Sequence, residues 1–211
     1  MPEMKKWLKG QVIIQEEEQA LEEARKERDG LVLWTDGSRK EDEWVGCAVV
    51  WKKTGRWNRR RVHLGPQKEA FEAEMYAMSK AVKIADAICE KKEVRRVTFF
   101  TDSQATLRRI QSEEPGPGQV LALRTMNWES ELTDNNIQVE YRWVPAHTGV
   151  EGNKEADLQV TKAAYKHCGS YTETQNPLPH LNYISFAHIG QRLTEEKWEE
   201  SKKGIKEMGK K

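Results

Sequence analysis

The stretch that is most informative about the fold is Leu31-Val32-Leu33-Trp34-Thr35-Asp36-Gly37-Ser38. Four apolar residues and a β-branched threonine in succession are typical of a buried strand. An aspartate, a glycine and a serine then end the apolar run, and these residues favour turns. We therefore expect a strand over residues 31–35, with Asp36 at its carboxyl end.

Two more strands are predicted directly after this one. Residues 44–51 form the second, and residues 57–64 return as the third. Lys53-Thr54-Gly55 supplies the turn between them, and Gly65-Pro66 stops the third strand. Because the turns are short, the three strands are expected to form an antiparallel meander.

A helix with one apolar face follows. Its apolar residues are spaced 4, 3, 4, 3 and 4 apart, at Phe71, Met75, Met78, Val82, Ala85 and Cys89. Beyond it we expect a strand over residues 94–101, helices over 104–111 and 120–132, a strand over 137–144, and a last helix from a cap at Asn153 to about residue 167. Helices that follow strands imply parallel neighbours joined by crossovers, so the fold class is α/β with a mixed sheet.

The two ends of the chain differ in composition from its middle. Residues 1–29 are expected to be a helical extension or linker, with the helix over about 14–28, and residues 170–211 a linker and a charged helix. Residues 30–169 then form the main domain. The longest apolar runs fall far short of the roughly 18–20 residues of a membrane span, which excludes an integral membrane protein. Three widely separated cysteines argue against a disulfide framework and favour a reducing, intracellular compartment.

Four carboxylates occupy positions that are typical of functional residues. Asp36 and Asp102 each follow a predicted strand, and functional groups gather at the carboxyl ends of strands in sheets with parallel crossovers. Glu74 lies about 60° from the axis of the apolar helix stripe, so its side chain can reach toward the sheet. Asp157 falls about one turn into the last helix. Taken singly, each has a structural explanation as a turn, cap, border or helix-dipole residue.

Four carboxylates that meet at one point repel one another unless cations neutralise them, since burial and like charge raise an acid's pKa. Ligation by oxygen alone favours Mg²⁺ or Mn²⁺ over zinc. Two such ions about 3.5–4 Å apart can activate water and stabilise the leaving oxygen of a phosphoryl displacement. The sequence thus predicts a site for two Mg²⁺ ions, which Mn²⁺ can replace.

His147 lies in a glycine-containing loop, ten residues before Asp157. Its ordinary pKa of about 6.5 suits it to move protons beside the carboxylates. A surface histidine without a function is the alternative that the sequence alone leaves open.

Several motifs occur in a fixed order: Thr35-Asp36-Gly37-Ser38, Ala73-Glu74-Met75-Tyr76-Ala77, Thr101-Asp102-Ser103-Gln104, and residues 143–149 followed by 152–157. Together they resemble a type 1 ribonuclease H domain, and the domains that non-LTR retrotransposons carry downstream of reverse transcriptase are the most similar in kind. The resemblance covers roughly residues 31–167.

The resemblance implies a fold, an activity and partners. The fold is a five-stranded mixed sheet flanked by helices, with the first three strands antiparallel and the others parallel. The activity is endonucleolytic hydrolysis of the RNA strand of RNA–DNA hybrids with two Mg²⁺ ions, leaving 5′-phosphates. The setting is retroelement reverse transcription, with a covalently linked upstream reverse transcriptase as a partner.

The resemblance also assigns roles to single residues. The metal-binding carboxylates match Asp36, Glu74, Asp102 and Asp157, and the loop histidine that activates water or releases product matches His147. Substrate contacts match Gly37, Ser38 and Gln104.

A basic stretch lies outside these motifs. Residues 52–61 hold six cations and no anion, with Trp51 directly before them and Trp57 among them. Arg59, Arg60 and Arg61 are therefore expected to grip the phosphate backbone of the hybrid. The alternative is a solvated edge strand whose cations prevent pairing with other sheets. For the whole domain, the alternatives are a catalytically idle nucleic-acid-binding or spacer domain, and a nuclease that acts on DNA alone.

Overall fold

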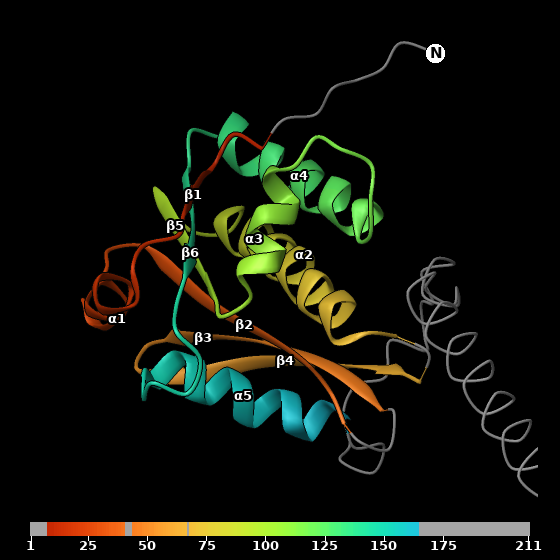
Figure 1. Ribbon diagram of the computed structural model, residues 1–211. Coiled ribbons are helices and arrows are strands. Elements are labelled where there is room, and N and C mark those ends of the chain that lie inside the picture. The colour runs from red at the N-terminus through yellow and green to blue at the C-terminus, as the bar shows by residue number, and fades with distance from the viewer. Residues whose placement is uncertain (1–7, 41–43, 67, 165–211) are drawn as a thin grey trace, which may run out of the picture.

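The computed structural model describes residues 8–40, 44–66 and 68–164, and a single mixed sheet runs through them (Figure 1). Its strands are β1 Gln11–Ile13, β2 Leu31–Arg39, β3 Val45–Lys53, β4 Arg56–Gly65, β5 Arg96–Thr101 and β6 Gln138–Trp143. They lie in the order β1-β6-β5-β2-β3-β4. Strands β2, β3 and β4 pair antiparallel, whereas β2–β5, β5–β6 and β6–β1 pair in parallel. The predicted mixed α/β sheet is confirmed.

The predicted number of five strands was wrong, because the sheet has six. The additional strand is β1, which pairs with β6 at its outer edge. Three residues are too few to show an alternating pattern, so this strand depends on its partner rather than on local preference. Helix α1, Glu17–Arg25, follows β1 and is shorter at both ends than the helix expected over 14–28.

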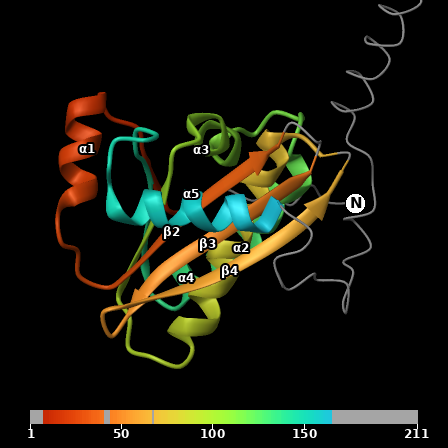
Figure 2. The ribbon, with the colours of Figure 1, turned by 90° about the horizontal axis from the view of Figure 1, so that it is seen from below.

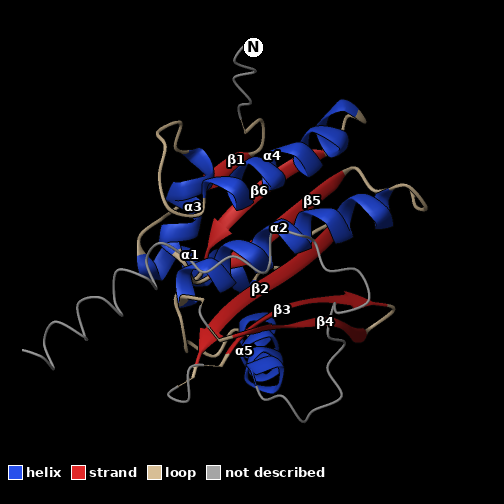
Figure 3. Cartoon of the chain, turned by 90° about the vertical axis from the view of Figure 1, so that its right-hand side faces the viewer, coloured by secondary structure: helices blue, strands red, loops and turns tan. Residues whose placement is uncertain are grey.

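Helices cover both faces of the sheet. Helices α2 Ala70–Cys89, α3 Gln104–Gln111 and α4 Gln119–Asp134 pack together on one face, and α5 Glu151–Ala164 lies on the other face against β2, β3 and β4 (Figures 2 and 3). The apolar stripe predicted for residues 71–89 is the face with which α2 contacts β2. No helix in the described ranges has the length and apolar character to cross a membrane.

Two apolar clusters form the core, one on each face of the sheet. The larger cluster joins the sheet to α2 and α4, with Leu33, Met75 and Phe99 fully buried. The smaller cluster lies toward α5, where the rings of Trp34 and Phe100 stack with centroids 4.1 Å apart. Apolar packing on both faces fixes β2 and β5, the strands that carry the expected aspartates.

The helix caps agree with the sequence at one site and differ at another. Ser103, directly before the helix predicted over 104–111, caps α3, since its hydroxyl accepts a hydrogen bond from the backbone N–H of Thr106 at 3.2 Å. Asn153 was predicted to cap the last helix, but α5 begins at Glu151 and Asn153 lies inside it, buried. The predicted linker and charged helix over 170–211 lie outside the described residues.

Candidate active site

The register of the sheet brings two aspartates to the same edge. Thr35 of β2 lies opposite Thr101 of β5 in a parallel pair, so the next residues, Asp36 and Asp102, lie side by side. Asp36 is buried and Asp102 half-buried. Asp102 directly follows β5, as the sequence predicted. Asp36 was predicted at the carboxyl end of a strand over 31–35, but it lies inside β2, because this strand continues to Arg39 in its pairing with β3.

Close packing of α2 on β2 brings in a third carboxylate. A Cβ atom on Gly37 would lie 2.3 Å from the backbone nitrogen of Glu74, so only glycine permits this approach. Glu74 is 9% exposed and points into the protein, as its place beside the apolar stripe predicted. The backbone N–H of Gly37 donates to the carboxylates of both Asp36 and Glu74.

The structure joins three of the four expected carboxylates in one cluster. Oxygen atoms of Asp36, Glu74 and Asp102 all lie within 4.8 Å of one another. Asp157, on α5, is exposed and does not belong to this group. Its charge nevertheless raises the pKa of both Asp36 and Asp102, so its carboxylate lies next to the cluster.

Burial and crowding make the carboxylate cluster hard to ionise. Burial, and then the charge of Asp102, raises the pKa of Asp36 to about 7. Burial, and then the charge of Asp36, raises the pKa of Glu74 well above its ordinary value. A hydrogen bond between these two carboxyl groups lets them share a proton. Without a cation, the cluster therefore holds protons at neutral pH.

Asp102 has polar neighbours that offset part of this cost. Burial raises its pKa, while a hydrogen bond from Asn153 and the charge of His147 lower it. The side-chain amide of Asn153 lies 3.4 Å from the Asp102 carboxylate, and the indole N–H of Trp143 donates to the Asp102 carbonyl at 3.0 Å. Sequence reasoning treated Asn153 as a helix cap and missed this contact. The sequence did hold a signal for this contact, because Asn153 lies four residues before Asp157 and therefore on the same face of the helix.

His147 lies in the exposed loop between β6 and α5, close enough to Asp102 to lower its pKa. Its backbone φ is 55°, which is uncommon outside glycine. The hydroxyl of Thr148 donates to the carbonyl of Pro145 at 2.9 Å and closes the loop. The structure thus places the predicted histidine beside the carboxylates.

The predicted substrate residues fall into two groups. Gly37, Ser38 and Gln104 adjoin the aspartates in sequence and lie at the same edge of the sheet. Gln104 is the first residue of α3, and its side-chain oxygen accepts a hydrogen bond from Arg108 at 3.0 Å.

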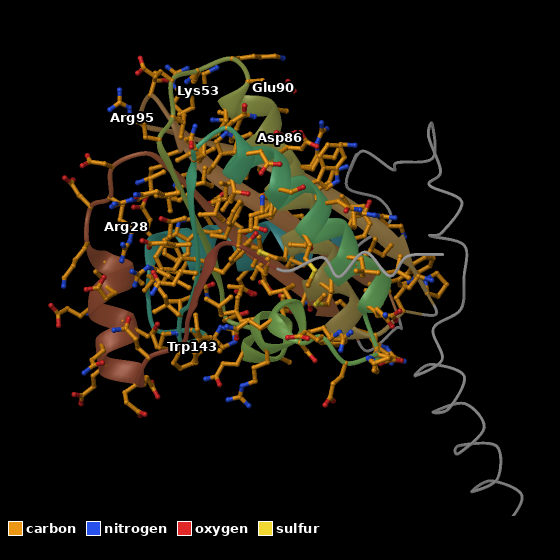
Figure 4. All side chains as sticks on the ribbon, turned by 90° about the horizontal axis from the view of Figure 1, so that it is seen from above. Arg28, Lys53, Asp86, Glu90, Arg95 and Trp143 are labelled. Atoms are coloured by element: carbon orange, nitrogen blue, oxygen red, sulfur yellow. The ribbon has the colours of Figure 1, made fainter. Side chains whose placement is uncertain are left out.

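The three predicted arginines lie on the edge strand β4. Arg61 is opposite Ala48, which is in turn opposite Asp36, so Arg61 is two strands away from the cluster. Arg59 and Arg60 line a groove of about 760 Å³ between the β3–β4 hairpin and the end of α2. No carboxylate lines this basic groove, whose cations are Lys52, Lys53, Arg59, Arg60, Lys91 and Lys92. Figure 4 shows Lys53 at one end of the molecule and Trp143, which contacts Asp102, at the opposite end.

The donor set of the cluster fits a divalent cation. One side-chain oxygen of Glu74 is buried and has no hydrogen-bond partner among the described residues. Buried polar atoms of native proteins nearly always have a partner, so this oxygen points to a ligand that the protein binds. Hard ions such as Mg²⁺ and Mn²⁺ prefer oxygen ligands of this kind, and a cation would allow all the carboxylates to ionise.

Comparison with known structures defines the class of fold. The chain is similar to the N-terminal RNase H domain of rv2228c from Mycobacterium tuberculosis, with a TM-score of 0.52 and 15% identity over 64% of this chain and 98% of that one. It is also similar to LC11-RNase H1, solved in complex with an RNA/DNA hybrid, with a TM-score of 0.50 and 19% identity over 64% and 96%. The fold is therefore the ribonuclease H-like α/β fold.

Sequence comparison narrows this class to a family. The RNase H family model matches residues 28–165, which include every residue of the carboxylate cluster. The chain is 24% identical over 146 residues to the ribonuclease H of Ruthia magnifica subsp. Calyptogena magnifica, covering 64% of this chain and 96% of that protein. The chain belongs to the RNase H family.

Proposed function

We propose that the protein is an endonuclease that hydrolyses the RNA strand of RNA–DNA hybrids with two bound Mg²⁺ ions and leaves 5′-phosphates. The observation that carries this proposal is the buried cluster of Asp36, Glu74 and Asp102, within 4.8 Å of one another in a chain of the RNase H family. The hybrid bound to LC11-RNase H1 supports the choice of substrate.

In this proposal the three clustered carboxylates hold the metal ions, and Asp157 joins them from α5. When bound, such ions activate water and stabilise the leaving oxygen of a phosphodiester. His147, exposed beside Asp102, exchanges protons with solvent during the reaction. Gly37, Ser38 and Gln104 then contact the RNA strand, where 2′-hydroxyls in the minor groove distinguish RNA from DNA.

The basic groove gives the hybrid a second contact in this proposal. The end of α2 at Ile88 lies about 21 Å from Glu74 along the helix, at about 1.5 Å per residue. At about 3.4 Å per base pair, roughly six base pairs span this length. The same duplex can therefore reach the cluster and the cations beside Arg59 and Arg60.

The biological setting is also a proposal. A reverse transcriptase joined upstream would supply RNA–DNA hybrids directly to this domain during replication of a retroelement. The motifs quoted from the sequence support this setting, as does the order in which they occur. A reducing intracellular compartment agrees with Cys47 and Cys89, which are thiols rather than halves of a disulfide.

Cleavage of a labelled RNA–DNA hybrid in Mg²⁺ tests the proposed function, with Asp102→Asn as the matched variant. We expect the wild type to cut only the RNA strand, and the variant to lose about 100-fold or more in kcat because metal stabilisation amounts to several kcal/mol. Intact hybrid with the wild-type protein would point to an idle domain. Equal cleavage of double-stranded DNA would point to a DNA nuclease.

A further inference from the structure

Residues 8–27 lie outside the matched family region, yet they are built into the folded domain. We call residues 8–27 the N-terminal arm. Its strand β1 extends the sheet by pairing with β6. Ahead of β1, the backbone N–H groups of Lys9 and Gly10 donate to the carboxylate of Glu129, a fully buried residue of α4. The arm is thus fixed to the domain at its start.

Helix α1 of the arm packs where the catalytic segments meet. Ala24 is 7% exposed and belongs to the smaller apolar cluster. Of the six other buried members, all but Val50 lie within three residues of a predicted catalytic residue in the sequence: Trp34 before Asp36, Phe100 before Asp102, Val144 and Val150 on either side of His147, and Ala156 before Asp157. A shift of α1 would therefore displace, through this packing, the backbone near four of the five predicted catalytic residues.

Ion pairs fasten the end of α1 to strand β6. Arg28, labelled in Figure 4, donates to Glu23 at 2.7 Å, and Arg142 of β6 lies 3.6 Å from the same carboxylate. Arg142 also donates to Glu140 at 2.8 Å, and the guanidinium of Arg28 lies over the ring of Phe100. Both arginine side chains are only 13% exposed, so these pairs are screened less than ordinary surface pairs.

One side chain of the arm contacts the histidine loop directly. The guanidinium of Arg25, in the last turn of α1, donates to the backbone carbonyl of Thr148 at 3.4 Å. Thr148 follows His147, whose positive φ must be maintained by its surroundings. Figure 2 shows the loop that precedes α5 beside α1.

We infer that the N-terminal arm is a positioning element of the active site, and that Arg25 positions the loop that carries His147. The inference rests on the proposed function, because it assigns the arm a part in that reaction. The contact of Arg25 goes to the loop and not to the carboxylate cluster, so we assign it to positioning of the loop rather than to catalysis.

Hybrid cleavage by full-length Arg25→Ala tests this role, with Lys26→Ala as the control. Lys26 is the cation that follows Arg25 as the C-cap of α1, and its ion pairs go to Glu22 and Glu23 of that helix. We expect Arg25→Ala to lower kcat about 3- to 10-fold with KM within twofold, which is less than the loss of a whole acid–base group. An equal loss in Lys26→Ala would overturn the inference.

A double-mutant cycle separates positioning from general destabilisation. If Arg25 acts through the histidine, adding Arg25→Ala to His147→Ala lowers kcat no further. A loss that persists in the His147→Ala background would contradict this role.

Hydrogen exchange measures the loop without any cleavage assay. We expect faster exchange at the amides of residues 147–150 in Arg25→Ala and unchanged exchange in Lys26→Ala. This readout holds even if the wild-type protein cleaves no hybrid, so failure of the proposed function and failure of the inference can be told apart. Unchanged exchange in both variants would refute the contact from Arg25.

Discussion

At the scale of single residues, the site is defined by carboxylates that are costly to bury together. Asp36, Glu74 and Asp102 converge within 4.8 Å, and the pKa of each is raised chiefly by burial. A protein that retains such a cluster loses stability in its metal-free state. Such a cost is typical of functional sites, and a bound cation would balance the charge of this one.

This cost gives a prediction for the metal-free protein. The pKa of Asp36 is about 7 in the folded state and about 3.8 when unfolded, so the proton bound by the folded state stabilises it at low pH. That contribution is lost as pH rises from about 4 to about 7. We expect the Tm of Asp36→Asn to exceed that of the wild type by at least about 3 °C at pH 8, with the difference closing toward pH 4.

Thermal unfolding in EDTA measures this difference, and saturating Mg²⁺ provides the comparison. The ions bind ionised carboxylates, so we expect Mg²⁺ to raise the wild-type Tm more at pH 8 than at pH 5, and to do little for Asp36→Asn. A wild type that is the more stable of the two at pH 8 without metal would show that Asp36 is not a costly charge.

Much of the candidate site could be predicted from the sequence at this scale, because apolar strands and helix periodicity fix where Asp36, Asp102 and Glu74 point. The contact of Asn153 with Asp102 could not, since it depends on where α5 begins and how it crosses the sheet. The distance of Asp157 from the cluster depends on the same packing. Its role as a metal ligand remains a prediction.

At the scale of elements, the approach of α2 to β2 decides whether the cluster forms. Gly37 provides the room, because a Cβ at this position would lie 2.3 Å from the backbone of Glu74 and 2.5 Å from that of Ala73. A backbone atom cannot move aside as the end of a flexible side chain can. The helix as a whole would have to shift away from the sheet, together with its carboxylate.

We therefore expect Gly37→Ala to lower the free energy of unfolding by about 1–3 kcal/mol and to reduce hybrid cleavage about 10-fold or more. Gly116→Ala is the control, since its Cβ would meet only the guanidinium of Arg109, at 3.2 Å, and should change stability by less than about 0.5 kcal/mol. Urea unfolding and kcat measure the two effects. A Gly37→Ala variant as stable and active as the control would show that the close packing is not required.

The β3–β4 hairpin carries the prediction about substrate binding. Replacing Arg59, Arg60 and Arg61 by alanine should weaken binding of a hybrid and reduce the salt slope by about 0.9 for each phosphate that is no longer neutralised, while turnover of bound hybrid is nearly unchanged. The matched control replaces the same three residues by lysine, which keeps the charge and should keep the slope. An alanine variant with the wild-type slope would assign these arginines to protection of the edge strand instead.

Most elements could be predicted from the sequence because local pattern and tertiary environment agree in them. The boundaries of α3 match the prediction, and the stripe of α2 is the buried one. Strand β1 could not be predicted, because its three residues gain their hydrogen bonds from β6 rather than from any pattern of their own. Regular elements are predictable where periodicity is long, and partner-dependent ones are not.

At the scale of the whole molecule, the two faces of the sheet contribute different residues to the candidate site. Helices α2, α3 and α4 form one layer with the larger core, and this layer carries Glu74. Helices α5 and α1 contribute to the smaller cluster on the other face, next to the histidine loop. The candidate site lies at the edge of the sheet, where one layer contributes Glu74 of α2 and the other contributes Asn153 of α5. The N-terminal arm extends this arrangement beyond the part of the chain that the family model matches.

The central claim is that these layers meet in a site for divalent cations. Crystals of the full chain soaked in Mn²⁺ and measured at the manganese absorption edge test it most directly. We predict anomalous peaks in contact with carboxylate oxygens of Asp36, Glu74 and Asp102, with Asp157 drawn toward them. Well-ordered crystals with manganese bound elsewhere, or with no peak at the cluster, would contradict the claim.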